Sequence, residues 1–177
     1  MKKADLIWII ATAALVFYLL SAFLAPVVVK ASDKFYNNTL LSDEAYEACV
    51  EIGEEYGIAP ELLMAIAETE SSGKPNAQNG SCKGLMQVSE DCHRDRMKEL
   101  GVENIYDEAG NILLATDYLV ELFMEEEDVG LVLSIYHGES RAYELYEAGE
   151  LSAYAERILE RAAEITETRD QFCNAVG

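Results

Sequence analysis

The chain has 177 residues, of which 50% are hydrophobic and 26% are charged, and this balance excludes an intrinsically disordered or collagen-like protein. Asp and Glu number 33 against 13 Lys and Arg, so the formal net charge is −20. Phosphate groups would be repelled by that charge, which argues against a protein that binds nucleic acid or an anionic membrane surface.

The N-terminal segment predicts a membrane anchor. No charged residue occurs from Leu6 to Val29, and a helix of this length exceeds the roughly 20 residues that cross a bilayer. Lys2 and Lys3 precede the apolar stretch and favour an N-terminus in the cytoplasm, with the rest of the chain outside it. The alternative is a secretory signal that is cleaved, after which the remainder would be secreted.

Both interpretations divide the chain in the same way. Residues 1–31 form the anchor or signal segment, residues 32–41 form a linker, and residues 42–177 form one domain outside the cytoplasm. The localisation that we expect is the cell membrane, with a single-pass helix and the C-terminal domain on the outer side.

The hydrophobic periodicity after the linker is helical, and no stretch alternates long enough to predict a strand with certainty, so we expect a mostly α domain. Ser42 can cap the first helix, which ends at Gly57. The second helix begins at Pro60 and runs to about Ser72. Further helices are expected at residues 90–100, 111–124, 129–136, 140–148 and 151–168, and the last has an apolar stripe that includes Tyr154 and Ile158.

Four cysteines follow the N-terminal segment, and an even number in an oxidising compartment favours disulfides. Cys82 with Cys92 would close a short loop that stabilises the fold by roughly 3 kcal/mol. Cys49 with Cys173 would tie the first helix of the domain to the C-terminal tail, and we favour this set of pairs. A zinc site with Cys82, Cys92 and His93 is the alternative, but it lacks a fourth ligand at a recognisable spacing, so no metal is expected.

Glu70 is the candidate general acid. Leu63, Ile66 and Glu70 fall three and four residues apart on the second helix, so the carboxyl of Glu70 continues its buried face. Glu68 points elsewhere. A carboxyl group against apolar walls has a raised pKa and can stay protonated near neutral pH. The same position also fits an ordinary glutamate at the end of a helix.

Short motifs follow one another along the chain: Ala67–Gly73, Pro75–Ala77, Gly84–Val88, Asn111–Ile112, Tyr118–Leu119 and Leu133–Tyr136. In this order, with Glu-Ser-Ser-Gly and then Gly-Leu-Met-Gln, they resemble the lytic transglycosylase family over about residues 57–140. The resemblance implies a single lysozyme-like domain of the goose-type lysozyme and lytic transglycosylase kind. It also implies cleavage of the β-1,4 bond between N-acetylmuramic acid and N-acetylglucosamine in peptidoglycan, with formation of a 1,6-anhydro ring and no cofactor.

Position by position, the resemblance makes Glu70 the catalytic residue, which acts first as acid and then as base. It assigns substrate-binding or cleft-supporting roles to Ser71, Gly84, Leu85, Met86, Gln87, Asn111 and Tyr136. The residue types leave other roles open: a helix-end cap for Ser71, core packing for Met86 and Tyr136, and helix capping for Asn111.

The chain departs from the family directly after Tyr136. The family usually has an asparagine there, whereas this chain has His137. We expect His137 to take the place of that asparagine in the substrate site, although a histidine that only satisfies a local hydrogen bond is the alternative.

Two other functions remain open. A muramidase of the goose type would transfer the sugar to water, with Glu90 or Asp91 as the second carboxyl group that hydrolases use. A wall-binding or scaffold module would keep the fold without turnover. The expected partners are the glycan strands of peptidoglycan, the membrane through the N-terminal helix, and a secretion or conjugation apparatus around which a tethered enzyme would open the wall.

Overall fold

The computed structural model describes residues 38–176, which form one compact unit. The predicted anchor at residues 1–31 and most of the predicted linker lie outside the described residues. Among the helices of residues 38–176, none combines the length and the apolar character that a membrane-spanning helix requires.

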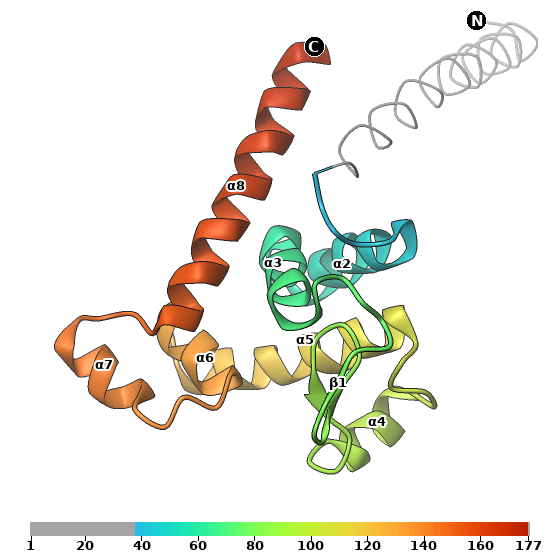
Figure 1. Cartoon of the computed structure of the whole chain (residues 1–177), viewed down its shortest axis with the longest axis vertical. Helices are drawn as coiled ribbons and strands as arrows, with labels where there is room; N and C mark the ends of the chain where they lie inside the picture. The colour runs from blue at the N-terminus through green and yellow to red at the C-terminus, as the bar shows by residue number, and fades with distance from the viewer. Residues whose placement is uncertain (1–37, 177) are drawn as a thin grey trace, which may run out of the picture. The chain divides into compact units, whose positions relative to one another are not determined.

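Seven helices account for most of the described chain, so the prediction of a mostly α fold is confirmed (Figure 1). They are α2 (Asp43–Tyr56), α3 (Pro60–Ser71), α4 (Arg94–Leu100), α5 (Glu108–Glu125), α6 (Val129–Tyr136), α7 (Ala142–Ala148) and α8 (Ala153–Val176).

The ends of the first two helices follow local chemistry. The side chain of Ser42 accepts a hydrogen bond of 3.1 Å from the backbone N–H of Ala45, and Gly57 ends α2 in the left-handed conformation with φ 71°. Pro60 occupies the first turn of α3. These boundaries confirm the predictions made from the sequence.

A small antiparallel sheet was not predicted. It consists of β1 (Gln78–Asn79), β2 (Cys82–Lys83) and β3 (Val88–Ser89), in the order β1-β2-β3. Strands of two residues are too short to produce an alternating hydrophobic pattern, so the periodicity could not reveal them.

Three helix boundaries differ from the prediction by three residues or more. Helix α4 begins at Arg94 instead of residue 90, because the chain first completes β3 and a turn closed by the bond from the N–H of His93 to the carbonyl of Ser89. Helix α5 begins three residues before Asn111, since Asp107 caps it through a 2.8 Å bond from Gly110. Helix α8 continues past residue 168 to Val176.

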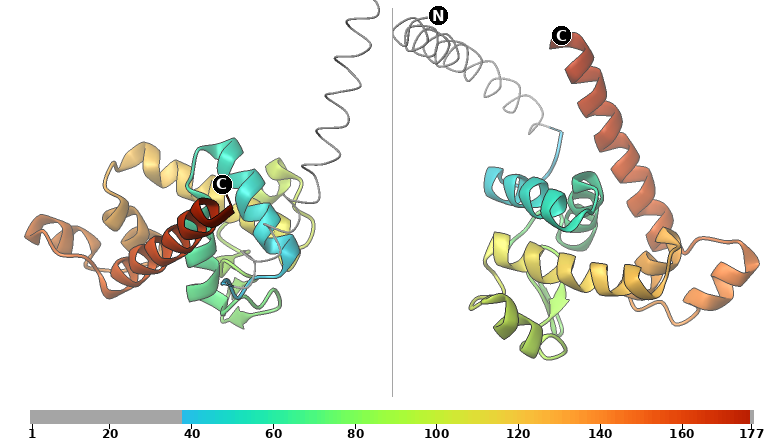
Figure 2. Two further views of the ribbon diagram at one scale, coloured as in Figure 1. Left: turned by 90° about the horizontal axis from the view of Figure 1, so that it is seen from above. Right: turned by 180° about the vertical axis from the view of Figure 1, so that it is seen from behind.

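Helix α3 lies at the centre of the domain, and its apolar side chains Leu63, Met64 and Ile66 are fully buried. Helix α2 packs against α3 and α5, and α8 packs against α3 and α6. Figure 2 shows α5 crossing under α2 when the domain is seen from behind. Helix α3, which carries Glu70 near its C-terminal end, is therefore held in place by the helices packed around it.

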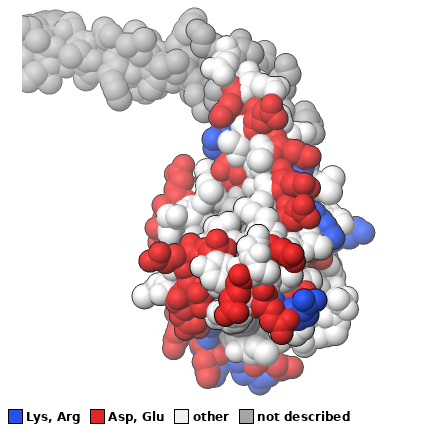
Figure 3. All heavy atoms as spheres, turned by 90° about the vertical axis from the view of Figure 1, so that its left-hand side faces the viewer, with Lys and Arg blue, Asp and Glu red and all other residues white. Residues whose placement is uncertain are grey.

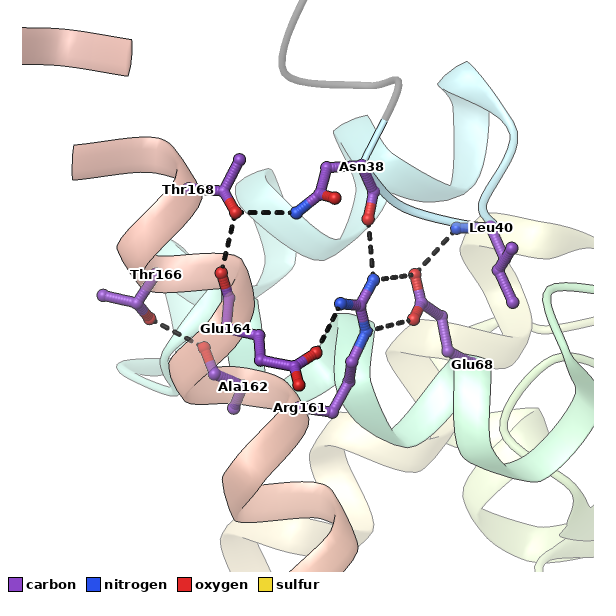
Figure 4. A network of polar contacts seen from close by, with 8 residues as sticks. All are labelled: Asn38, Leu40, Glu68, Arg161, Ala162, Glu164, Thr166 and Thr168. Carbon is purple, nitrogen blue, oxygen red and sulfur yellow. Dashed lines mark hydrogen bonds and ion pairs between the residues drawn. The ribbon is translucent and has the colours of Figure 1, made fainter. Parts of the chain in front are cut away.

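An ionic network joins α8 to α3 (Figure 4). The side chain of Glu68 is only 6% exposed and lies 2.7 Å from the Nε of Arg161. It also accepts a bond of 2.7 Å from the N–H of Leu40, while Arg161 donates to the carbonyl of Asn38 at 2.6 Å. Glu68 lies on a different face of α3 from Glu70, as predicted. It is not a surface acid, because α8 covers it and Arg161 pairs with it.

The three cysteines whose side chains are described, Cys49, Cys82 and Cys92, are free. The expected bridges are therefore not formed in this structure. Cys82 on β2 pairs with Ser89 on β3, three residues short of Cys92. Cys49 is fully buried, and burial together with the nearby charge of Glu68 raises the pKa of its thiol to about 12.

Acidic side chains outnumber basic ones on the side of the molecule where α7 lies (Figure 3). This distribution agrees with the net charge of −20.

Candidate active site

A groove with a volume of about 440 Å³ opens between the end of α3, the sheet, the turn before α4 and the end of α6. Glu70 is the one carboxyl residue among the described residues that line it. The full lining comprises Glu70, Asn79, Cys82, Gln87, Val88, Ser89, Cys92, His93, Tyr118, Ile135, Tyr136, His137 and Gly138.

The carboxyl of Glu70 is held between protein and solvent. Its side chain is 15% exposed, and its Oε1 accepts a bond of 2.6 Å from the hydroxyl of Tyr154. The Nδ1 of His137 lies 3.8 Å from the same oxygen. Burial raises the pKa of Glu70, and the bond from Tyr154 and the proximity of His137 offset part of that rise. This environment suits a general acid, although the catalytic role of Glu70 stays a prediction.

Tyr154 comes from α8 and is buried. Burial and the charge of Glu70 raise the pKa of Tyr154 far above its ordinary value, so the phenol keeps its proton and donates it to the carboxyl. The sequence placed Tyr154 in the apolar stripe of the last helix and gave no signal for a role beside Glu70. The ring of Tyr154 is buried as that stripe predicts, and its hydroxyl is the polar group that reaches Glu70.

Asn111 supports the groove from behind. Its side chain is fully buried, its Oδ1 accepts from the N–H of Met86 at 2.7 Å, and its Nδ2 donates to the carbonyls of Ile105 at 2.9 Å and Lys83 at 3.1 Å. Gly84 has φ 79°, and a Cβ atom there would lie 2.3 Å from the Nδ2 of Asn111. Only glycine therefore fits this turn against Asn111.

Gln87 and Tyr136 hold the loop that faces the groove. The Nε2 of Gln87 donates to the carbonyls of Gly84 at 2.9 Å and Ala77 at 3.2 Å. The hydroxyl of Tyr136 donates to the carbonyl of Met86 at 2.8 Å. The bonds of Gln87 hold the loop to itself, and the bond of Tyr136 joins the end of α6 to that loop.

Ser71 lies behind the groove at the end of α3. Its hydroxyl donates to the carbonyl of Ala67 at 2.9 Å and accepts from the N–H of Lys74 at 3.2 Å. These are the bonds of a helix-end cap. The buried hydroxyl is already paired within the chain, and Ser71 is not part of the groove lining.

The structure brings four of the predicted site residues together around the groove: Glu70, Gln87, Tyr136 and His137. The others lie behind it as structural support: Ser71, Gly84, Leu85, Met86 and Asn111. Their roles toward a substrate stay predictions.

An aromatic wall was not assigned from the sequence. The rings of Tyr136 and Tyr118 lie 5.8 Å apart, and the ring of Tyr118 lies 4.6 Å from that of His93. Arg96 covers Tyr118 at 5.4 Å from the ring centroid. Tyr118 belongs to one of the short motifs, so the motif order carried a signal for it, whereas the sequence singled out His93 only as a possible zinc ligand.

We expect Asn111→Ala to lower the free energy of unfolding by about 3 kcal/mol, because it leaves a buried N–H and two carbonyls without their partner. Urea unfolding followed by circular dichroism measures the change. The matched control is Asn79→Ala, at an exposed strand position, which should cost about 0.5 kcal/mol or less. Equal losses in the two variants would contradict the supporting role of Asn111.

A mostly helical domain whose groove holds one protected carboxyl group has the architecture of lysozyme-like domains. The family model described as "Transglycosylase SLT domain" matches residues 47–150, which is more than half of the chain, and the chain belongs to this family. The match confirms the resemblance seen in the motifs. Helix α8, which supplies Tyr154 and Arg161, follows the matched range.

The chain is also similar to a protein named "Transglycosylase" from Enterobacteria phage PRD1. The two are 36% identical over 85 residues, which cover 48% of this chain and 31% of the phage protein. The chain thus matches less than a third of the length of that relative.

Proposed function

We propose that this protein is a peptidoglycan lytic transglycosylase. It cleaves the β-1,4 bond between N-acetylmuramic acid and N-acetylglucosamine and leaves a 1,6-anhydro ring on the muramic acid. The observation that carries the proposal is the single carboxyl of Glu70, which is largely buried at the groove and has a raised pKa. Membership of the SLT family and the name of the phage relative support the same reaction class.

In the first step Glu70 acts as the acid. Its Oε1 is occupied by the bond from Tyr154, and no group within residues 38–176 donates a hydrogen bond to Oε2. Oε2 therefore carries the proton toward the substrate. The proton moves to the glycosidic oxygen, the bond from that oxygen to the anomeric carbon breaks, and its electron pair stays with the departing sugar.

In the second step the carboxylate of Glu70 acts as the base. The C6 hydroxyl of the muramic acid attacks the anomeric carbon, and its proton passes to the carboxylate as the new C–O bond closes the anhydro ring. The hydrogen bond from Tyr154 stabilises the carboxylate between the two steps. The acid is restored and no water is consumed.

The neighbouring acids support a mechanism with one carboxyl group. Glu90 pairs with Lys83 at 2.5 Å, and Asp91 pairs with Arg94 at 2.8 Å. Neither acid belongs to the groove lining, whereas glycoside hydrolases usually place two carboxyl groups on either side of the bond. This arrangement favours the transglycosylase over the muramidase.

The test is a product analysis. Purified peptidoglycan is digested with the full chain, and the soluble fragments are analysed by mass spectrometry. We expect muropeptides that end in 1,6-anhydro-N-acetylmuramic acid. Reducing ends would identify a muramidase, and binding to the wall without soluble fragments would identify a wall-binding module.

We further propose that the domain works outside the cytoplasm, held at the membrane by the apolar segment of residues 6–29. A tethered domain of this size suits local opening of the wall around a secretion or conjugation apparatus. Fractionation of cells that produce the full chain, with protease added to intact spheroplasts, tests this location. Release of the chain into the soluble fraction would instead identify a cleaved signal.

In the Tyr154→Phe variant, the loss of activity at alkaline pH should move to higher pH. The bond from Tyr154 favours the carboxylate and so lowers the pKa of Glu70; its removal raises that pKa, and the acid form persists at higher pH. The pH dependence of kcat/KM measures the shift. Tyr146→Phe, on the exposed face of α7, is the control and should leave the limb in place. A shift toward lower pH would contradict the assigned hydrogen bond.

A further inference from the structure

Exposed large apolar side chains gather around α7. Among the residues of 38–176 whose side chains are described, five such residues are exposed, and four of them lie between residues 124 and 151. We call these four the α7 patch: Met124, Tyr143, Tyr146 and Leu151. Met124 is 84% exposed. Single exposed apolar residues are ordinary on a protein surface, whereas a group of them marks a contact site.

Two contacts bring members of the patch to the same part of the surface. The hydroxyl of Tyr143 on α7 donates a bond of 2.7 Å to Glu126, two residues after Met124 at the end of α5. Leu151 covers the first turn of α6, where a Cβ atom on Gly130 would lie 2.3 Å from the Cδ2 of Leu151. The patch therefore spans the end of α5, α7 and the segment that leads to α8.

The patch belongs neither to the core nor to the groove. Helix α7 packs against α6, and Ala142 is its buried residue. Tyr143 and Tyr146 lie one helical turn apart and are both about half exposed. None of the four patch residues lines the groove. Their apolar surface is thus left for a contact that residues 38–176 do not supply.

The patch lies among negative charges. Residues 124–151 contain one Lys or Arg, which is Arg141, and it pairs with Glu144 at 2.9 Å. The same range contains eight acidic residues: Glu125, Glu126, Glu127, Asp128, Glu139, Glu144, Glu147 and Glu150. Figure 3 shows acidic side chains interspersed with uncharged surface on the side where α7 lies. A partner that covers the patch would therefore meet acidic residues at its rim, which positive charge complements.

We propose that the α7 patch is a docking site for a protein segment that carries Lys or Arg residues beside an apolar stripe. Tyr and Met are enriched at protein interfaces, which favours a protein partner. A glycan strand brings no cation to the acidic residues, and an anionic membrane surface is repelled by them. A partner docked there would leave the groove residues free. The proposal invokes no reaction, so it stands apart from the proposed function.

The experiment uses a synthetic helical peptide with Lys on one face and Leu on the other, and a second peptide with Glu in place of Lys. Each carries a fluorophore and a photoreactive group. Titration of the full chain measures the affinity, and mass spectrometry of the cross-linked and digested complex locates the attachment. We expect the basic peptide to attach within residues 124–151 and to bind more weakly as salt is added. The acidic peptide should not bind.

Combining Met124→Ser with Tyr143→Ser should weaken the binding of the basic peptide about tenfold, since a few apolar and aromatic anchors carry most of the energy of an interface. Both side chains are exposed, and thermal unfolding checks that the double variant is folded. The matched control combines Glu51→Gln with Glu54→Gln on α2, which is acidic but has no large exposed apolar residue. It should change the affinity by about twofold at most.

Three results would overturn the proposal. The first is attachment spread over the whole acidic surface, or equal affinities of the wild type and the Met124→Ser, Tyr143→Ser variant. The second is a dimer of the chain alone in sedimentation that this variant dissociates, because a second copy would then cover the patch. The third is binding of soluble glycan strands that the variant loses, which would assign the patch to the glycan.

Discussion

Replacing Glu70 by Gln should reduce the rate of glycan cleavage by about a thousandfold, the typical contribution of a general acid and base. The amide has nearly the shape of the carboxyl and can still accept the bond from Tyr154, but it has no proton to give to the glycosidic oxygen. Release of soluble muropeptides from purified peptidoglycan measures the rate.

Glu90→Gln is the matched control for this variant. Glu90 directly follows β3, but it pairs with Lys83 and does not line the groove, so we expect little change in rate. Equal cleavage by the Glu70→Gln protein and the wild type would refute the catalytic assignment.

The stability of Glu70→Gln provides a further check. The pKa of Glu70 is raised in the folded state, so the folded state disfavours the carboxylate, and this group destabilises the wild type as pH rises above the pKa of the unfolded chain. A neutral glutamine escapes that cost. At pH 7 the variant should unfold at the same urea concentration as the wild type or at a higher one, which shows that lost activity is not lost folding.

Arg161→Ala should lower the free energy of unfolding by about 4 kcal/mol, because it leaves the buried charge of Glu68 without its partner. Arg161 also binds the carbonyl of Asn38, so the start of the domain should loosen in the same variant (Figure 4). Urea unfolding measures the first effect, and hydrogen exchange of residues 38–42 measures the second.

Arg157→Ala is the matched control on the same helix. Arg157 is exposed, and its loss should cost about 0.5 kcal/mol or less. A double variant that replaces both Glu68 and Arg161 by Met should recover much of the stability, since no unpaired charge remains. A loss in Arg161→Ala as small as that in Arg157→Ala would contradict the buried ion pair.

The family resemblance and the helical spacing agreed on Glu70 for different reasons. The spacing needed only residues three and four apart on one helix, and the motif order needed only the linear sequence. Neither could separate Gln87, which faces the groove, from Met86, which is buried beside it. Neighbouring residues of a tight turn point in different directions, and local sequence does not encode which of them meets solvent.

The sequence by itself determined most of the helices and the face of α3 on which Glu70 lies, because caps such as Ser42 and apolar spacing act within a few residues. Only the tertiary structure decided what surrounds the carboxyl and what holds its helix. Tyr154 meets Glu70 across 84 residues of chain, and Arg161 meets Glu68 across 93. Such contacts arise from the way α8 packs on α3, and no local pattern carries that information.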